Sequence, residues 1–475
     1  MLAFRIIVVG FIVSLPLIAS AQSVGDRVLV TVTYETKIKT EKVDKVIAGQ
    51  IKTISAINGV WCSFEDVQGW LPVRYTMSLD GGLKFFSERI GAQPNDAEAY
   101  TTRGMLYYEI GRYEQAFKDF TQALRINPRV SVPWNNRAMV FIASGKWNEA
   151  LSDVSKSIEL SPRFADAYVN RSLVYANLGK FELALADIDK AIEIEPSNAL
   201  HFIRRGSIHF DRGNLDAASA DFDKAASINS RLPEIFLGRG NVLLSQGKID
   251  EAIENAKRAV ELGGTNAKAH NLLGWLLYES KQAEQAIGSF NRAINLDPMF
   301  AIAYSNRGVA QVELGRVDDA IKDYNRAIGL DKNAALTYCN RGTAWMNKGE
   351  FAKAKADFEA SLKIAPDLPE TMNVFAWFLC TCKDDSFRDG KRANELAEKA
   401  VAASEQPNWY RVDTLAAAKA EIGEFDKAVE LQTQVIEEAP ADKKDACQQR
   451  LQLFQNKQPV RSEFGKIATQ DRKSS

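Results

Sequence analysis

Residues 97–130 read AEAYTTRGMLYYEIGRYEQAFKDFTQALRINPRV, and residues 131–164 read SVPWNNRAMVFIASGKWNEALSDVSKSIELSPRF. The same arrangement returns every 34 residues, and its clearest marker is an alanine in the second half of each unit. Alanine makes up only about one residue in ten of an average protein, so eight alanines at constant spacing do not arise by chance. The alanine column contains Ala116, Ala150, Ala184, Ala218, Ala252, Ala286, Ala320 and Ala354.

The other columns of the repeat suit a pair of antiparallel helices. A small residue twelve positions before the alanine lets two helices cross closely. A glycine five positions before the alanine ends the first helix, where positive φ is usual, and proline twelve positions after it stops the second helix. The small column contains Gly104, Ala138, Ser172, Gly206, Gly240, Gly274, Gly308 and Gly342. The glycine column contains Gly111, Gly145, Gly179, Gly213, Gly247, Gly315 and Gly349, with Lys281 as the exception.

This combination of columns at a 34-residue period resembles the tetratricopeptide repeat. Eight regular units occupy 97–368, and two degenerate units occupy 369–440, the first with a charged insertion at 383–390. The resemblance implies a mainly α fold, a right-handed α–α superhelix of about ten repeats that forms a solenoid. It also implies a scaffold that holds a peptide or helix of a partner protein in a concave groove.

A pair of charged columns accompanies the repeat. Arginine stands just before the small residue in seven units, and aspartate stands three positions after the alanine in six. The sixth unit has Leu273 and Ser289 at these positions and so loses both partners. Columns that change together indicate contact, so we expect an ion pair between the two helices of a unit. The pairs are Arg103 with Asp119, Arg137 with Asp153, Arg171 with Asp187, Arg205 with Asp221, Arg307 with Asp323 and Arg341 with Asp357.

Residues 1–21 are typical of a secretory signal peptide. Arg5 gives a positive start, an apolar run follows, and Ala19-Ser20-Ala21 fits the small-x-small cleavage rule. We expect cleavage after Ala21 and export to the periplasm or cell envelope, without membrane insertion of the mature chain. The alternative is that the segment stays uncleaved as an anchor.

Residues 22–77 change to the period-two alternation of β-strands. Asn58-Gly59 is a strong hairpin signal, and Gly69-Trp70-Leu71 resembles the closing strand of bacterial SH3-like domains. The resemblance implies a small barrel that contacts peptides or the cell wall through surface aromatics. The alternative is that Trp61 and Trp70 only pack the barrel interior. The Lys-, Thr- and Glu-rich segment 32–46 is expected to be a flexible loop.

The segments around the repeats are expected to serve the solenoid. A connecting helix is predicted in 78–96, and a capping helix with a polar face is predicted in 441–455, because the ends of a solenoid need such caps. Residues 456–475 are polar and are predicted to be disordered.

Composition and motifs argue against several function classes. The 60 basic and 61 acidic residues give a net charge of -1, so a nucleic-acid partner is not expected. The five cysteines suggest no disulfide framework. The chain carries no phosphate-binding loop, metalloprotease motif, nucleophile elbow or zinc spacing. We therefore expect no enzyme, cofactor or metal, although a site built across several repeats stays open as an alternative.

The candidate binding site is the track of amide and aromatic residues along the first helices. Asparagine can donate to and accept from a bound backbone, and tryptophan is common among binding hot spots. The alternative is that these amides only meet water. The candidate residues are Asn136, Asn170, Asn271, Trp275, Tyr278, Asn306 and Asn340. The expected partners are other proteins bound in this groove, and the alternative function is cell-wall or peptide binding through the SH3-like domain with the repeats as a spacer.

Overall fold

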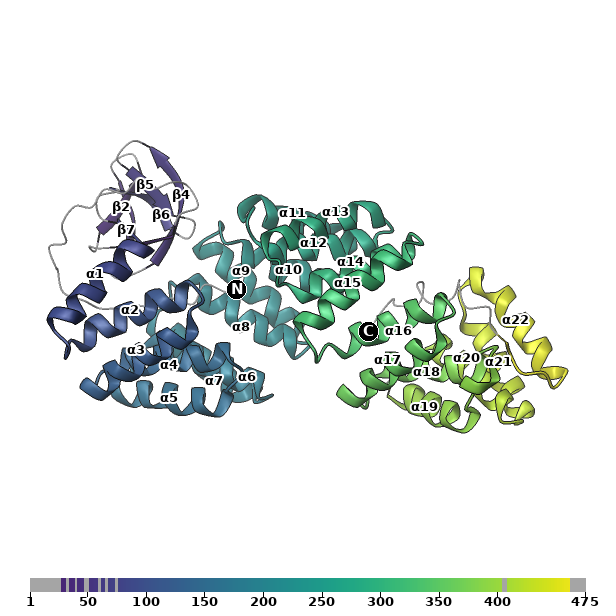
Figure 1. Ribbon diagram of the computed structural model, residues 1–475. Coiled ribbons are helices and arrows are strands. Elements are labelled where there is room, and N and C mark those ends of the chain that lie inside the picture. The colour runs from purple at the N-terminus through teal and green to yellow at the C-terminus, as the bar shows by residue number, and fades with distance from the viewer. Residues whose placement is uncertain are drawn as a thin grey trace. The chain divides into compact units, whose positions relative to one another are not determined.

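The computed structural model describes residues 79–403 and 408–461 in full, and the backbone of seven strands within residues 27–78. The protein is mainly α-helical, and its twenty-two described α-helices form a solenoid of helical hairpins (Figure 1). The chain divides into two units, Met1–Val242 and Leu243–Ser475, and each is described by itself.

Seven strands precede the helices, and their pairs are antiparallel. The strands follow the order β3-β2-β6-β5-β4-β1-β7 in the sheet. Their bounds are β1 Arg27–Val30, β2 Tyr34–Ile38, β3 Glu41–Val46, β4 Ile51–Asn58, β5 Trp61–Phe64, β6 Val67–Pro72 and β7 Thr76–Ser78. The segments between successive strands from β1 to β7 lie outside the described residues, as does the predicted signal peptide 1–21, so the SH3-like barrel stays a prediction.

The prediction of a loop over 32–46 was wrong, because β2 and β3 lie in this segment and pair with each other from Tyr34↔Val46 to Ile38↔Glu41. Charged residues suggested a loop, but threonine, valine and isoleucine recur among them and favour extended backbone.

The first unit contains α1 and four and a half repeats. The helices are α1 Leu79–Ala92, α2 Ala97–Glu109, α3 Tyr113–Ile126, α4 Ser131–Ala143, α5 Trp147–Leu160, α6 Ala165–Asn177, α7 Phe181–Ile194, α8 Ala199–Asp211, α9 Leu215–Ile228 and α10 Pro233–Ser245, within whose last turn the unit boundary falls.

The second unit continues the same hairpins. Its helices are α11 Ile249–Leu262, α12 Ala267–Glu279, α13 Ala283–Leu296, α14 Ala301–Glu313, α15 Val317–Leu330, α16 Ala335–Asn347, α17 Phe351–Ile364, α18 Pro369–Thr381, α19 Gly390–Ala402, α20 Trp409–Glu421, α21 Phe425–Glu438 and α22 Ala441–Gln455. A short 3₁₀ helix, η2 Asp385–Phe387, lies in the charged insertion. The predicted tail 456–475 lies outside the described residues from position 462 onward.

Side chains fix where the helices begin. The Asp96 carboxylate accepts a hydrogen bond from the backbone N–H of Ala99 and caps α2. The aromatic residue of the fourth helical position bonds the turn before it: Trp134 Nε1 donates to the Pro128 carbonyl at 2.9 Å. Tyr168 and Tyr304 make the corresponding bond, so in these three repeats the first helix is tied to the turn that precedes it.

The turn between the two helices of a repeat needs a left-handed residue. The seven predicted glycines have φ between 67° and 77°, which glycine adopts without steric cost. In the sixth repeat Lys281 adopts φ 66°, a conformation that costs a side chain about 1–2 kcal/mol. The sixth repeat therefore keeps the shape of the turn without its usual residue.

In seven of the eight regular repeats the small residue matches the residue that faces it on the second helix; the exception is Gly240 of the fifth repeat, which has Ala256 sixteen positions later. Glycine occurs where that residue is aromatic: a Cβ added to Gly274 would lie 2.7 Å from the ring of Phe290. Where the facing residue is aliphatic, the small residue has a side chain, as in Ala138 with Val154 and Ser172 with Ile188. The glycine–aromatic pairs are Gly104 with Phe120, Gly206 with Phe222, Gly274 with Phe290, Gly308 with Tyr324 and Gly342 with Phe358.

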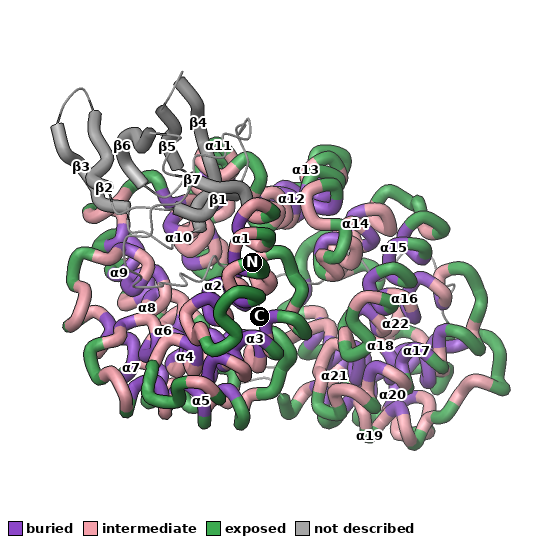
Figure 2. The backbone as a smooth tube through the Cα atoms, turned by 60° about the vertical axis from the view of Figure 1, so that its left-hand side comes forward, coloured by how far each residue is buried: buried purple, intermediate pink, exposed green. Residues whose placement is uncertain are grey.

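The apolar core is a series of clusters along the solenoid. Figure 2 shows buried segments along the helices and exposed segments at the turns between them. One cluster joins α1 to α4 through Phe86, Leu106 and Met139. Another joins α12, α13 and α14 through Leu277, Phe290 and Ala310, among others. Each hairpin therefore buries its apolar face against its neighbours, as stacked repeats must.

The match between glycine and ring predicts a coupled effect on stability. Gly274→Ala should lower the free energy of unfolding by about 1–2 kcal/mol, because overpacking outweighs the higher helix propensity of alanine. In a Phe290→Ile background the same change should cost less, since the pair then resembles Ser172 with Ile188. Urea unfolding of the four variants measures this coupling.

Gly329→Ala is the matched control, because a Cβ at this helical position meets no atom within 4 Å. It should be neutral or mildly stabilising. Equal effects of Gly274→Ala and Gly329→Ala in both backgrounds would contradict the account.

Candidate protein-interaction site

The expected ion pairs between the two helices of a repeat are confirmed. Arg171 Nε donates to Asp187 Oδ2 at 2.7 Å, and Arg171 Nη2 donates to Asp187 Oδ1 at 2.7 Å. This planar two-bond geometry is the strong form of an arginine–carboxylate contact. The other five pairs repeat it at 2.6 to 2.9 Å: Arg103 with Asp119, Arg137 with Asp153, Arg205 with Asp221, Arg307 with Asp323 and Arg341 with Asp357.

These ion pairs are partly buried, and their guanidinium groups lie over aromatic rings. The six aspartate side chains are only 6–8% exposed and the arginine side chains 17–28%. The Arg171 guanidinium lies 5.6 Å from the ring centroid of Tyr168 and 5.9 Å from that of Tyr175. The hydrogen bond with Asp187 raises the pKa of Arg171, so the arginine stays charged.

The same arginines also reach the preceding repeat. Arg341 Nη1 donates to Asn325 Oδ1 at 2.6 Å, while its other nitrogens hold Asp357. Arg205 makes the corresponding contact with Asp189 at 2.7 Å. Five of the six paired guanidinium groups thus join three helices, while Arg171 bonds only Asp187 among the described residues, so the column serves the fold.

The amide track is joined across successive first helices. Asn170 Nδ2 of α6 donates to Asn135 Oδ1 of α4 at 2.9 Å, and Asn306 Nδ2 of α14 donates to Asn271 Oδ1 of α12 at 3.2 Å. Sequence reasoning placed these amides on one track but did not foresee that they bond one another. An asparagine has two donor hydrogens and two acceptor lone pairs, so each of these bonds leaves further hydrogen-bonding capacity.

The predicted site residues fall in both units. Asn136 on α4 and Asn170 on α6 lie in the first unit and are 1% and 2% exposed. The Asn136 Nδ2 atom is buried without a hydrogen-bond partner among the described residues. Asn340 on α16 lies in the second unit and is also buried. These three amides present little surface to a partner.

The other four predicted residues lie on two neighbouring helices of the second unit. Asn271, Trp275 and Tyr278 belong to α12, and Asn306 belongs to α14. Tyr278 is buried, while Asn271, Trp275 and Asn306 are half-buried. The structure thus brings the accessible part of the predicted site together at the sixth and seventh repeats.

Trp275 has a packing role that its position in the repeat did not reveal. Its ring lies 5.3 Å from that of Tyr278, at an interplanar angle of 35°. Trp275 also packs against the cluster that contains Phe290 and Ala310. Helix packing therefore uses this aromatic residue, although part of the indole stays accessible.

The sequence analysis did not identify three side chains that lie close together at the sixth repeat and are basic or can be protonated: Lys257, His270 and Arg292. A signal was available, because His270 stands in the column that is aromatic in the other regular repeats. Burial lowers the pKa of His270 and the charge of Arg292 lowers it further, against a backbone hydrogen bond to Gly264.

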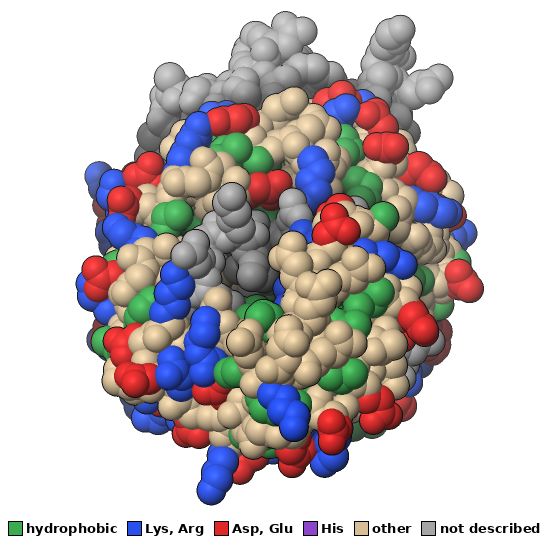
Figure 3. Space-filling model, turned by 90° about the vertical axis from the view of Figure 1, so that its right-hand side faces the viewer, with side chains coloured by type: hydrophobic (Ala, Val, Ile, Leu, Met, Phe, Trp, Pro, Cys, Tyr) green, Lys and Arg blue, Asp and Glu red, His purple; other side chains and the backbone are tan. Residues whose placement is uncertain are grey.

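Charges of both signs are mixed over the face drawn in Figure 3, where Lys and Arg side chains alternate with Asp and Glu. In the part of the chain that the structure describes, no group of His, Cys, Asp and Glu side chains is suited to hold a metal ion. Among those same residues, no helix is both long enough and apolar enough to cross a membrane.

Comparison with family models identifies the repeats. Three models described as the tetratricopeptide repeat match one segment each, and a fourth model, described as a TPR repeat, matches a continuous run. The matched segments are 97–130, 165–198 and 335–368 for the first description, and 206–247, 240–281, 274–315 and 310–349 for the second. The chain therefore contains tetratricopeptide repeats, and these repeats indicate a protein–protein interaction scaffold.

Solved structures of tetratricopeptide-repeat proteins are similar to parts of this chain. YrrB, described as having an unusual peptide-binding site, is 24% identical over 39% of this chain and 96% of its own, with a TM-score of 0.31. A protein from Parabacteroides merdae is 19% identical over 53% and 99%, with a TM-score of 0.44. A thermophilic protein from Thermus thermophilus is 25% identical over 38% and 99%, with a TM-score of 0.36. Comparison with curated proteins gives no match.

Proposed function

We propose that this protein is an extracytoplasmic scaffold that binds an extended or helical segment of a partner protein along the first helices of repeats six to eight. The observation that carries the proposal is the half-buried cluster of Asn271, Trp275 and Asn306 on α12 and α14. The proposal assigns the protein no reaction and no cofactor.

The amides supply the polar part of such a surface. The bond between Asn306 Nδ2 and Asn271 Oδ1 holds the two side chains in one orientation. The Nδ2 donors of Asn271 and the Oδ1 acceptor of Asn306 keep capacity for the carbonyl and N–H of a bound backbone. An amide pair that is already ordered loses less side-chain entropy when a partner binds.

Trp275 supplies the apolar part. Its contact with Tyr278 and with the cluster around Phe290 fixes the indole, and a fixed aromatic is a suitable anchor for a partner. Asn340 is a buried amide of the second unit, and Asn136 and Asn170 are buried in the first unit, so the proposed binding surface does not use them.

The second candidate function is binding of the cell wall or of a peptide through the SH3-like segment 22–77, with the repeats as a spacer. The paired strands β4 and β5, which join at Asn58↔Trp61, favour a folded β module there. The two candidates predict opposite effects of mutations in the two regions, so one experiment separates them.

Truncation of the anchor should weaken partner binding. With a partner isolated from the cell envelope, Trp275→Ala should raise the Kd by about thirtyfold or more, and Asn306→Ala by less, because a central tryptophan contributes about 2 kcal/mol or more to binding. Isothermal titration calorimetry measures both values.

Two controls accompany this titration. Ile302→Ala removes an apolar side chain of α14 that is 59% exposed and should leave the Kd unchanged. Trp70→Ala tests the β module. Circular dichroism must show that each variant is folded. Normal binding by Trp275→Ala together with loss of binding by Trp70→Ala would overturn the groove proposal and favour the β module.

The extracytoplasmic location rests on the signal-peptide pattern of residues 1–21. When the chain is produced in a bacterium with a secretion system, the exported protein should begin at Gln22, because Ala19 and Ala21 fit the peptidase specificity. Intact-mass spectrometry gives the start of the chain directly. A mass that still includes residues 1–21 would refute cleavage and favour the anchored alternative.

A further inference from the structure

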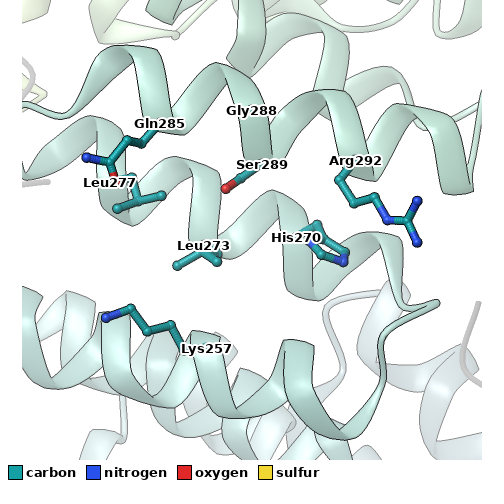
Figure 4. Close-up of a pocket in the computed structure, with 8 residues that line it drawn as sticks. All are labelled: Lys257, His270, Leu273, Leu277, Gln285, Gly288, Ser289 and Arg292. Atoms are coloured by element: carbon teal, nitrogen blue, oxygen red, sulfur yellow. The ribbon is translucent and has the colours of Figure 1, made fainter.

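A cavity of about 430 Å³ lies at the sixth repeat, between α11, α12 and α13 (Figure 4). Lys257 comes from α11, three residues from α12, and the remaining four from α13. The lining residues are Lys257, His270, Leu273, Leu277, Gln285, Gly288, Ser289 and Arg292. All eight belong to the second unit.

In the seventh repeat, an arginine side chain fills the space that corresponds to this cavity. The guanidinium of Arg307 lies 5.5 Å from the ring centroid of Tyr304 and donates two hydrogen bonds to Asp323. Its third nitrogen donates to Asn291 Oδ1, sixteen residues earlier, at 2.6 Å. One arginine thus fills the space between three helices.

In the sixth repeat every member of this arrangement is changed. Leu273 stands in place of the arginine, His270 in place of the aromatic ring, and Ser289 in place of the aspartate. Lys257 stands sixteen residues before Leu273, where the next repeat has Asn291. The shorter leucine leaves the guanidinium space open, and the cavity occupies it.

Gly288 widens the opening on α13. A Cβ at this position would meet no atom within 4 Å, so helix packing does not require glycine there. Gly288 and Lys257 are both exposed, and the cavity is therefore accessible from solvent.

The charge of the cavity is positive. Lys257 and Arg292 are basic, and no carboxylate is among the eight lining residues. Within the described residues Arg292 makes no hydrogen bond or ion pair. Lys257 pairs only with Glu254, at 2.8 Å on its own helix, and such exposed pairs contribute little to stability. Other repeats also have arginine at the position equivalent to Arg292. Lys257 and the absence of the aspartate therefore distinguish this cavity from the corresponding places in those repeats.

The wall of the cavity on α12 is apolar. Leu273 and Leu277 lie on it one helical turn apart, and Leu277 is almost fully buried. A ligand that fits both parts has an aliphatic stem over the leucines and an anionic head toward Lys257, with the Ser289 hydroxyl as a further donor; Arg292, which lies toward the other end of the lining (Figure 4), adds to the positive charge. Inorganic phosphate would use only the charged part.

We propose that this cavity binds a carboxylate on an aliphatic stem, supplied by a glutamate side chain of a partner protein. Leu273 and Leu277 lie about 200° around α12 from Trp275, because each residue turns the helix by about 100°. The cavity is thus separate from the surface of the proposed function, and its test can fail or succeed independently of it.

Methyl NMR of the leucine-labelled full chain tests the site. The Leu273 and Leu277 methyl signals are assigned through single Leu→Ile variants, and the probe is the capped peptide Ala-Ala-Glu-Ala-Ala. The glutamate peptide should shift both signals in a saturable manner, and the peptide with Gln in place of Glu should not. Glutarate, a free dicarboxylate, forms the second arm and distinguishes a small metabolite from a protein side chain.

Three variants make the result specific. Lys257→Gln should weaken binding about tenfold or more, because a charged hydrogen bond is lost. Arg258→Gln, on the same helix but outside the cavity lining, should bind normally. The triple variant Lys257→Asn, Leu273→Arg, Ser289→Asp restores the hydrogen-bonding partners of the Arg307 arrangement, so it should fold and should no longer bind.

Saturable shifts with the glutamate peptide that Lys257→Gln and the triple variant abolish would support the proposal. If glutarate shifts the signals and the glutamate peptide does not, the cavity binds a free carboxylate. That result would overturn the proposal that its ligand is a protein side chain. Equal shifts with the Glu and Gln peptides, or no shift with either peptide or with glutarate at 20-fold molar excess and above, would overturn the proposal.

Discussion

The bidentate ion pair between the two helices of a repeat is the interaction on which helix register depends in six of the eight regular repeats. A guanidinium has a planar fork of donors, so it accepts only one orientation of the aspartate. In Arg171 and Asp187 this fixes the register of α6 against α7. The further nitrogen of Arg205 or Arg341 reaches the second helix of the preceding repeat, so the same side chain also fixes the stacking of successive hairpins.

The sixth repeat keeps its hairpin without this pair, which shows that apolar packing is sufficient there. Gly274 still faces Phe290, and Ala286 is fully buried. Lys281 still adopts the left-handed conformation of the turn, at an energetic cost that glycine would avoid. A repeat that departs from several structural rules at once is a candidate for a functional role, because such departures concentrate at functional sites.

Much of the fold could be predicted from the sequence, because each column of the repeat has a local physical cause. The alanine and glycine columns predict the helical hairpins, and the joint replacement of arginine by Leu273 and of aspartate by Ser289 in the sixth repeat points to contact between the two helices. The bond between Asn271 and Asn306 could not be predicted in this way, because it depends on the stacking of residues 35 positions apart. The packing of Trp275 and the cavity at Lys257 depend on the same stacking, so they became visible only in three dimensions.

The most direct test of the account is a double-mutant cycle on Arg171 and Asp187, with the exposed pair Glu114 and Lys118 as the reference. Loss of one partner costs about 3–5 kcal/mol for a buried pair and under about 1 kcal/mol for an exposed one. For these partly buried side chains, Arg171→Ala should cost about 2–3 kcal/mol of unfolding free energy, and adding Asp187→Ala should cost much less than it does alone. The account predicts a coupling energy of about 1–2 kcal/mol for Arg171 with Asp187 and no measurable coupling for the reference pair. Strictly additive losses for Arg171 and Asp187 would contradict it.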